Sequence, residues 1–144
     1  MKLDILGITA HPDDAELSFG GTLLVHKEMG LKTGLVDLTQ GELGTRGTPE
    51  IRAREAEEAS KLLGLSAREN LSLPDGFFEN NRENQLKVVE QIRRFQPRIV
   101  IANSTYDRHP DHTRGSQLVE TAFFIAGLKE VKTVWDGQEQ EAYR

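Results

Sequence analysis

The stretch Leu3–Asp14, LDILGITAHPDD, joins a short apolar run to a cluster of histidine and aspartate. The run Leu3–Thr9 predicts a buried strand of a parallel sheet. A second stretch repeats the arrangement, since the apolar Ile99–Ala102, IVIA, precedes the motif HPDH at 109–112. Because the carboxyl ends of parallel strands share one edge of a sheet, two motifs about a hundred residues apart are expected to meet there.

Strand-like and helical segments alternate along most of the chain. Further strands are predicted at Lys32–Thr39 and Asn70–Leu73. Apolar residues at helical spacing, with proline or glycine near the ends, predict four helices at 15–29, Glu50–Leu63, Asn84–Phe95 and Thr113–Ala126. Such alternation is typical of an α/β fold with a parallel sheet and helices on its faces. Residues 1–128 are expected to form a single domain, and the polar tail 129–144 carries no assigned element.

The composition narrows the classes of partner. The chain has 144 residues, of which 37% are hydrophobic and 28% charged, as in an ordinary globular domain. A net charge of −5 without a basic stripe argues against nucleic acid or an anionic membrane as partner. Without cysteine, any metal must be held by histidine and carboxylate, and the absence fits the cytoplasm. Neither a signal peptide nor a run of about 18 apolar residues is present.

The two motifs contain a suitable set of ligands for zinc. Catalytic zinc takes three protein ligands and leaves one position open for water. Asp13, beside one of the candidate ligands, can stay off the metal and accept a proton from its water, whose pKa zinc lowers to about 7. The candidate ligands are His11, Asp14 and His112. The hypothesis from the residues alone is a mononuclear zinc site that hydrolyses an amide.

Other roles remain open for several residues. An aspartate such as Asp13 before a helix often only caps it, but duplication of the His-Pro-Asp motif favours a shared site. Arg52 is a candidate for binding a polar or anionic substrate group, because guanidinium forms a bidentate clamp. Asp75 lies in a Pro-Asp-Gly turn and is expected to be structural. Asn103 and Tyr106 are candidates for lining the pocket.

These motifs, with the loop TQGELGTRG at Thr39–Gly47 and the helix IRAREAEEA at Ile51–Ala59, resemble the LmbE/PIG-L-like zinc-dependent N-deacetylases. The resemblance runs from Met1 to about Leu128 and is strongest to the bacillithiol-biosynthesis branch, which acts on N-acetylglucosaminyl-malate. It implies a Rossmann-like, mostly parallel sheet, a Zn2+ cofactor and a small-molecule N-acetylglucosaminyl conjugate as substrate. It also implies a homo-oligomer.

The resemblance assigns a role to each site residue. Asp13 corresponds to the general base. His109 corresponds to the histidine that stabilises the oxyanion, and Asp111 to the carboxylate that holds and charges that histidine. Arg52 matches a position associated with substrate binding. The implied zinc ligands are His11, Asp14 and His112.

Chains of this family normally continue after the equivalent of Ala126–Leu128, with a segment that closes one side of the pocket and helps subunits associate. We expect that segment to be absent here, since 129–144 resembles only the polar approach to the family's final strand. Two other classes of function remain. A non-haem Fe(II) oxygenase also uses two histidines and a carboxylate, but usually on an all-β scaffold. A non-catalytic Rossmann-type module for a sugar or nucleotide is weakened by the absence of G-x-G-x-x-G.

Overall fold

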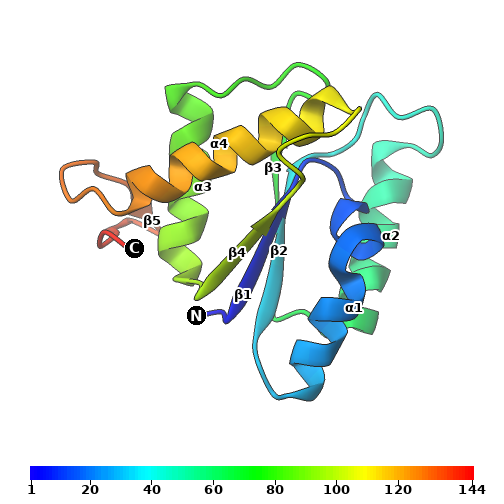
Figure 1. Cartoon of the computed structure of the whole chain (residues 1–144), viewed down its shortest axis with the longest axis horizontal. Helices are drawn as coiled ribbons and strands as arrows, with labels where there is room; N and C mark the ends of the chain where they lie inside the picture. Colours follow the sequence, from blue (N-terminus) through cyan, green and yellow to red (C-terminus); the bar gives the residue numbers. More distant parts are fainter.

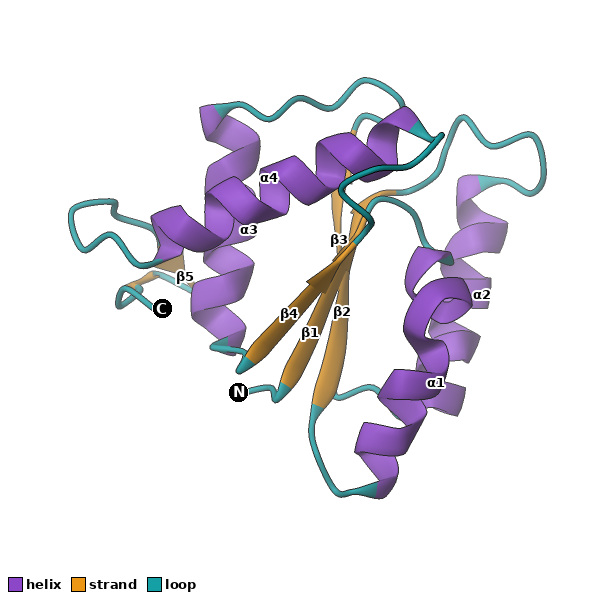
Figure 2. Ribbon diagram, in the orientation of Figure 1, coloured by secondary structure: helices purple, strands orange, loops and turns teal.

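The computed structural model describes residues 1–144 and contains a four-stranded parallel sheet between two pairs of helices (Figures 1 and 2). The strands lie in the order β3-β2-β1-β4, and every neighbouring pair is parallel. The mostly parallel α/β fold is thereby confirmed. The elements are β1 Ile5–Thr9, α1 Asp14–Glu28, β2 Thr33–Thr39, α2 Pro49–Leu63, β3 Ala67–Leu73, α3 Arg82–Phe95, β4 Ile99–Ala102 and α4 Pro110–Ala126.

Alternation along the central strands separates two cores, because successive side chains of a strand point to opposite faces. Leu6 and Ile8 of β1 pack in the larger core with α3 and α4, whereas Ile5 packs in the smaller core with α1 and α2. Figure 1 shows these helix pairs on opposite sides of the sheet. Gly7 faces α1, and a Cβ there would lie 2.6 Å from Leu35 and 2.9 Å from the Phe19 ring. Close packing of α1 on the sheet therefore requires glycine at this position.

The order of the strands places both motifs at one crevice. The chain moves from β1 to β2 to β3 on one side, and then returns to pair β4 with the other side of β1. At such a reversal the loops that follow β1 and β4 turn away from each other and leave a crevice between them. In α/β proteins, ligands bind in this crevice. The first motif follows β1 and the second follows β4, so both lie beside the same crevice.

The second motif differs from the prediction in its local structure. Helix α4 begins at Pro110 rather than at Thr113, so most of the motif forms the first helical turn. Proline suits this first helical position because its fixed φ matches the helix and its missing N–H has no partner there. The ring of His109 caps the helix, since its Nδ1 accepts the backbone N–H of Asp111 at 3.3 Å. The predicted start was therefore wrong by three residues.

Residues 129–144 pack onto α3 and α4 and include two short paired strands, β5 Val134–Trp135 and β6 Gln138–Glu139. Arg93 of α3, only 3% exposed, donates to the carbonyls of Ala126, Leu128 and Val131 and to the Thr133 hydroxyl. One buried guanidinium thus ties the end of α4 and the tail to α3. The helices of this structure are all too short or too polar to cross a membrane.

Candidate metal centre

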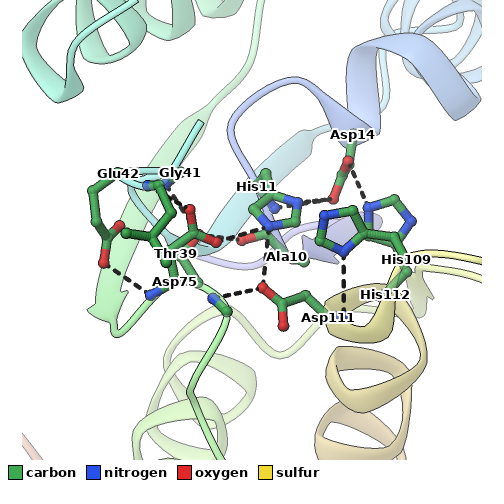
Figure 3. A network of polar contacts seen from close by, with 12 residues as sticks. Ala10, His11, Asp14, Thr39, Gly41, Glu42, Asp75, His109, Asp111 and His112 are labelled. Carbon is green, nitrogen blue, oxygen red and sulfur yellow. Dashed lines mark hydrogen bonds and ion pairs between the residues drawn. The ribbon is translucent and has the colours of Figure 1, made fainter. Parts of the chain in front are cut away.

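Side chains from both motifs converge at the carboxyl edge of the sheet (Figure 3). The ring centroids of His11 and His112 are 5.5 Å apart, and His109 lies within 4.8 Å of His11 and 4.7 Å of His112. The expected meeting of the two motifs is confirmed. The pocket beside them has a volume of about 420 Å³ and is lined mainly by polar side chains of four chain segments.

His11, Asp14 and His112 lie close enough together to share one metal ion. His11 Nδ1 lies 3.4 Å from one Asp14 oxygen, and His112 Nε2 lies 3.2 Å from the other. One ligand atom from each of the three residues lies within 4.8 Å of the others. The edge of a tetrahedron with zinc–ligand bonds of about 2.05 Å is about 3.3 Å long. These residues therefore fit a zinc ion in both donor type and spacing.

The outer nitrogen of each of these two histidines contacts a carboxylate. His11 Nε2 lies 3.0 Å from Asp75 Oδ1, and His112 Nδ1 lies 3.1 Å from Asp107 Oδ2. Metal-binding histidines usually donate their second ring N–H in this way, which fixes the tautomer and leaves the inner nitrogen free for the ion. Sequence reasoning missed Asp107 and treated Asp75 as merely structural.

Charge around His11 favours its protonated form when no metal is bound. Burial lowers the pKa of His11, but hydrogen bonding and charge from Asp14, with further contributions from Asp75 and Asp111, raise it to about 9. Burial alone would raise the pKa of Asp14, but hydrogen bonds from His11 and Asn103 leave it below its ordinary value. A cation is thus strongly favoured between these carboxylates, whether it is a proton on His11 or a metal ion.

Asn103 connects the two strands that carry the motifs. Its Nδ2 donates to Asp14 Oδ2 at 3.0 Å, and its Oδ1 accepts the backbone N–H of Ala10 at 2.8 Å. The same Asp14 oxygen accepts the backbone N–H of His11 at 3.0 Å, so the carboxylate is fixed from two directions. Tyr106, the other pocket candidate, is 93% exposed and does not line the pocket.

Asp13 occupies the N-cap position of α1 without capping it. Its side chain makes no hydrogen bond to the helix and is 56% exposed. Oδ1 pairs with Arg52 Nη2 at 3.3 Å. Burial raises the pKa of Asp13, and the positive charge of Arg52 opposes this rise. The capping interpretation is therefore not supported, and the carboxylate faces the pocket.

Arg52 is held by the glycine-rich loop between β2 and α2. Its Nη1 donates to the carbonyl of Gly41 at 3.1 Å, and a Cβ at Gly41 would collide with the guanidinium. Gly41 also has a φ of +64°, which side chains disfavour. Glycine at this position thus allows the loop to close over an arginine that lines the pocket.

Asp111 contacts a different histidine from the one expected. Its Oδ2 lies 3.3 Å from His11 Nε2 and accepts the Gly76 backbone N–H at 2.8 Å. Its Oδ1 accepts from Arg114 at 2.7 Å. The expected pairing of this carboxylate with the His109 ring is absent, because α4 begins early and directs Asp111 inward. A second possible metal group, formed by His11, His109 and Asp111, is less suitable because both Asp111 oxygens already have donors.

A cluster of histidine and aspartate that could hold a metal ion, placed where a parallel sheet reverses its strand order, defines a class of α/β proteins with a polar pocket at this crevice. Within that class, the chain belongs to the family described as PIG-L: GlcNAc-PI de-N-acetylase, which matches residues 6–123.

Three similar proteins illustrate this membership. The conserved protein TT1542 from Thermus thermophilus is 46% identical with a TM-score of 0.90, and the match covers 99% of this chain and 62% of that one. The diacetylchitobiose deacetylase of Thermococcus kodakarensis is 31% identical, over 86% of this chain and 50% of that protein. A protein of Bacillus anthracis named as a probable N-acetyl-α-D-glucosaminyl L-malate deacetylase 2 is 28% identical, over 89% of this chain and 62% of that protein. The chain thus spans 50–62% of the length of these relatives.

Proposed function

We propose that this chain carries the catalytic centre of a zinc-dependent N-deacetylase that removes the acetyl group from an N-acetylglucosamine conjugate. The observation that carries the proposal is the grouping of His11, Asp14 and His112, with one ligand atom from each within 4.8 Å of the others, in a pocket that Asp13 also lines. The Thermococcus and Bacillus relatives support the class of substrate through their names. N-acetylglucosaminyl-malate is the specific substrate that we infer, from the second relative and from the motifs.

The proposed roles follow from the contacts of each side chain. Zinc bound by the three ligands would supply a Lewis acid and a water with a pKa near 7. Asp13 lies in the pocket without a helix to cap, so it can take a proton from the attacking water and return it to the leaving amine. Arg52 holds Asp13 from the other side, and its place in the pocket suits contact with a polar substrate group.

His109 lines the pocket and is proposed as a hydrogen-bond donor to the substrate. Its Nδ1 accepts a backbone N–H, which places the proton of the neutral ring on Nε2. That N–H can bind the acetamide oxygen as negative charge develops on it. Removal of one such donor costs about 3–4 kcal/mol of transition-state stabilisation in known cases. His109 is therefore proposed to stabilise the oxyanion, and Asp111, whose backbone N–H holds the His109 ring, to position it.

The experiment is release of acetate from N-acetylglucosaminyl-malate, with zinc content measured in the same sample and diacetylchitobiose as second substrate. We expect acetate release by the parent, and Asp13→Ala to keep zinc and lose turnover. Glu79→Ala is the matched control, since Glu79 is exposed in the loop after β3 and does not line the pocket. Iron with oxygen-dependent turnover would favour the oxygenase class instead. Sugar binding with no acetate release, and no effect of Asp13→Ala on that binding, would favour a non-catalytic module.

Cytoplasmic location stays a prediction from the absence of cysteine, and homo-oligomer formation stays one from the family resemblance. Size-exclusion chromatography with light scattering tests the second of them directly.

A further inference from the structure

Asp75 is a buried carboxylate, 7% exposed, that the proposed reaction does not use. It lies in the turn after β3, at the same edge of the sheet as the two motifs. Its two oxygens contact different chain segments: Oδ1 lies 3.0 Å from His11 Nε2, and Oδ2 accepts the Leu43 backbone N–H at 2.9 Å. Asp75 therefore joins the candidate metal centre to the glycine-rich loop.

The loop holds Asp75 in return. The side chain of Glu42 accepts the backbone N–H of Asp75 at 2.8 Å, next to the bond from Leu43. Figure 3 shows Glu42, Asp75 and His11 as one chain of polar contacts. Two reciprocal hydrogen bonds thus fix the position of the turn relative to the loop. Their geometry determines where Asp75 Oδ1 lies, and through it the orientation of the His11 ring.

Two carboxylates surround His11 Nε2, but this nitrogen has a single proton to donate. Asp111 Oδ2 is the more distant, at 3.3 Å, and already accepts from Gly76, while Arg114 takes its other oxygen. Asp75 Oδ1 is nearer, at 3.0 Å, and His11 is its hydrogen-bonding partner. When a metal ion takes the place of the second proton on His11, the proton on Nε2 would be directed to Asp75, and the lone pair of Nδ1 would face the ion beside Asp14.

We propose that Asp75 is the positioning residue that orients His11 for metal binding, and that Glu42 fixes Asp75 for this role. The inference rests on the metal centre of the proposed function, but not on the substrate or on the reaction. It makes the glycine-rich loop, which also closes over Arg52, a structural support of the metal centre. A substitution of Glu42 in this loop should then weaken zinc affinity, although Glu42 is not a metal ligand.

The test is zinc affinity, measured by competition with a chromophoric chelator, together with the visible spectrum of the cobalt-substituted protein. Loss of such a partner of a metal-binding histidine typically weakens metal affinity about 10–100-fold, and we expect this for Asp75→Ala. Glu42→Ala should give a smaller loss, and Glu42→Gln, which keeps the acceptor oxygen, should restore the parent affinity. The cobalt bands, which report ligand geometry, should change in Asp75→Ala at saturating cobalt. They should not change in Glu79→Ala, the control in the same loop.

Parent-like affinity and cobalt bands in Asp75→Ala would overturn the inference. So would an effect confined to Asp111→Asn, because Asp111 would then be the partner of His11. If Asp75→Ala does not fold, Glu42→Ala decides, and unchanged zinc affinity there overturns the inference. A parent that binds zinc but releases no acetate would refute the proposed reaction alone, since every measurement here is made without substrate.

Discussion

The first motif, His11 to Asp14, and the second, His109 to His112, share three letters and perform different tasks. In the first, the histidine is buried beside the proposed ion and Asp13 faces the pocket. In the second, the histidine is exposed and caps a helix. Asp111 is only 1% exposed and is surrounded by hydrogen-bond donors. The cause is where each helix begins: at the fourth residue of the first motif, and at the second residue of the other. Position relative to the helix start, more than the letters themselves, decides which aspartate is available for chemistry.

The largest expected difference is between the two histidines that open the motifs. His11→Ala should lose zinc at a chelator concentration that leaves the parent loaded, and all turnover with it. His109→Ala should keep its zinc and lose about 10²–10³-fold in kcat, as expected for one oxyanion donor. Metal analysis after dialysis against the chelator, with kcat of the reloaded proteins, measures both. Equal metal content in His11→Ala and the parent would remove His11 from the ligand set.

The next largest difference is expected in kcat, between variants of Asp13 and Asp111, the third residues of the two motifs. Asp13→Asn should lower kcat about 10²–10⁴-fold, the usual contribution of a general base, with zinc affinity close to that of the parent. Asp111→Asn should have the smaller effect on kcat, because its carboxylate acts only through neighbouring groups. Steady-state kinetics of both zinc-loaded variants decides. A larger loss of kcat in Asp111→Asn would reverse the roles assigned here.

For the free energy of unfolding, Asp111→Asn should have the larger effect and Asp13→Asn the smaller. Asp111→Asn weakens contacts to Arg114, Gly76 and His11 at a buried position, so we expect the free energy of unfolding to fall by about 1–3 kcal/mol. Asp13→Asn changes a half-exposed side chain and should stay within about 0.5 kcal/mol of the parent. Urea unfolding of the metal-free proteins, followed by circular dichroism, gives both values. Equal stability of the two variants would mean that the burial of Asp111 has no energetic consequence.

Per pH unit, the effect on zinc binding should be smaller than the loss caused by removing a ligand. The pKa of His11 is raised from 6.5 to about 9, so at neutral pH the metal-free ring is protonated and zinc must displace that proton. Apparent zinc affinity should therefore rise with pH, by about tenfold per unit, and level off near pH 9. In the metal-free protein, the stabilisation from charged His11 should be complete below about pH 6.5 and be lost as the pH rises through 9. Competition titrations in zinc buffers at several pH values test the first statement, and a flat profile between pH 6.5 and 8 would contradict it.

Much of the fold follows from local patterns in the chain. Apolar runs and proline or glycine at their ends predicted every strand of the main sheet and every helix, although β3 begins at Ala67 instead of Asn70. The meeting of the motifs also followed, because parallel strands end at a common edge. The tail was not predicted, since Arg93 reaches its carbonyls from another helix and no local pattern shows that contact.

The partners of the metal-binding histidines were harder to predict. Asp75 and Asp107 each contact a histidine in the folded structure. A turn or loop aspartate has the same local sequence whether or not it makes such a contact. One signal was available for Asp75, because it follows β3 at the edge where the motifs meet. The contacts of the Asp111 carboxylate were not predicted, because they depend on where α4 begins, and helix boundaries are the least certain part of a pattern-based prediction.

The bond between Asn103 and Ala10 spans 93 positions of the chain. A growing polypeptide on the ribosome therefore has its first two candidate ligands long before His112 emerges. The three candidate ligands come together only where β4 lies beside β1, so the proposed ion would join the first and the last strand of the main sheet.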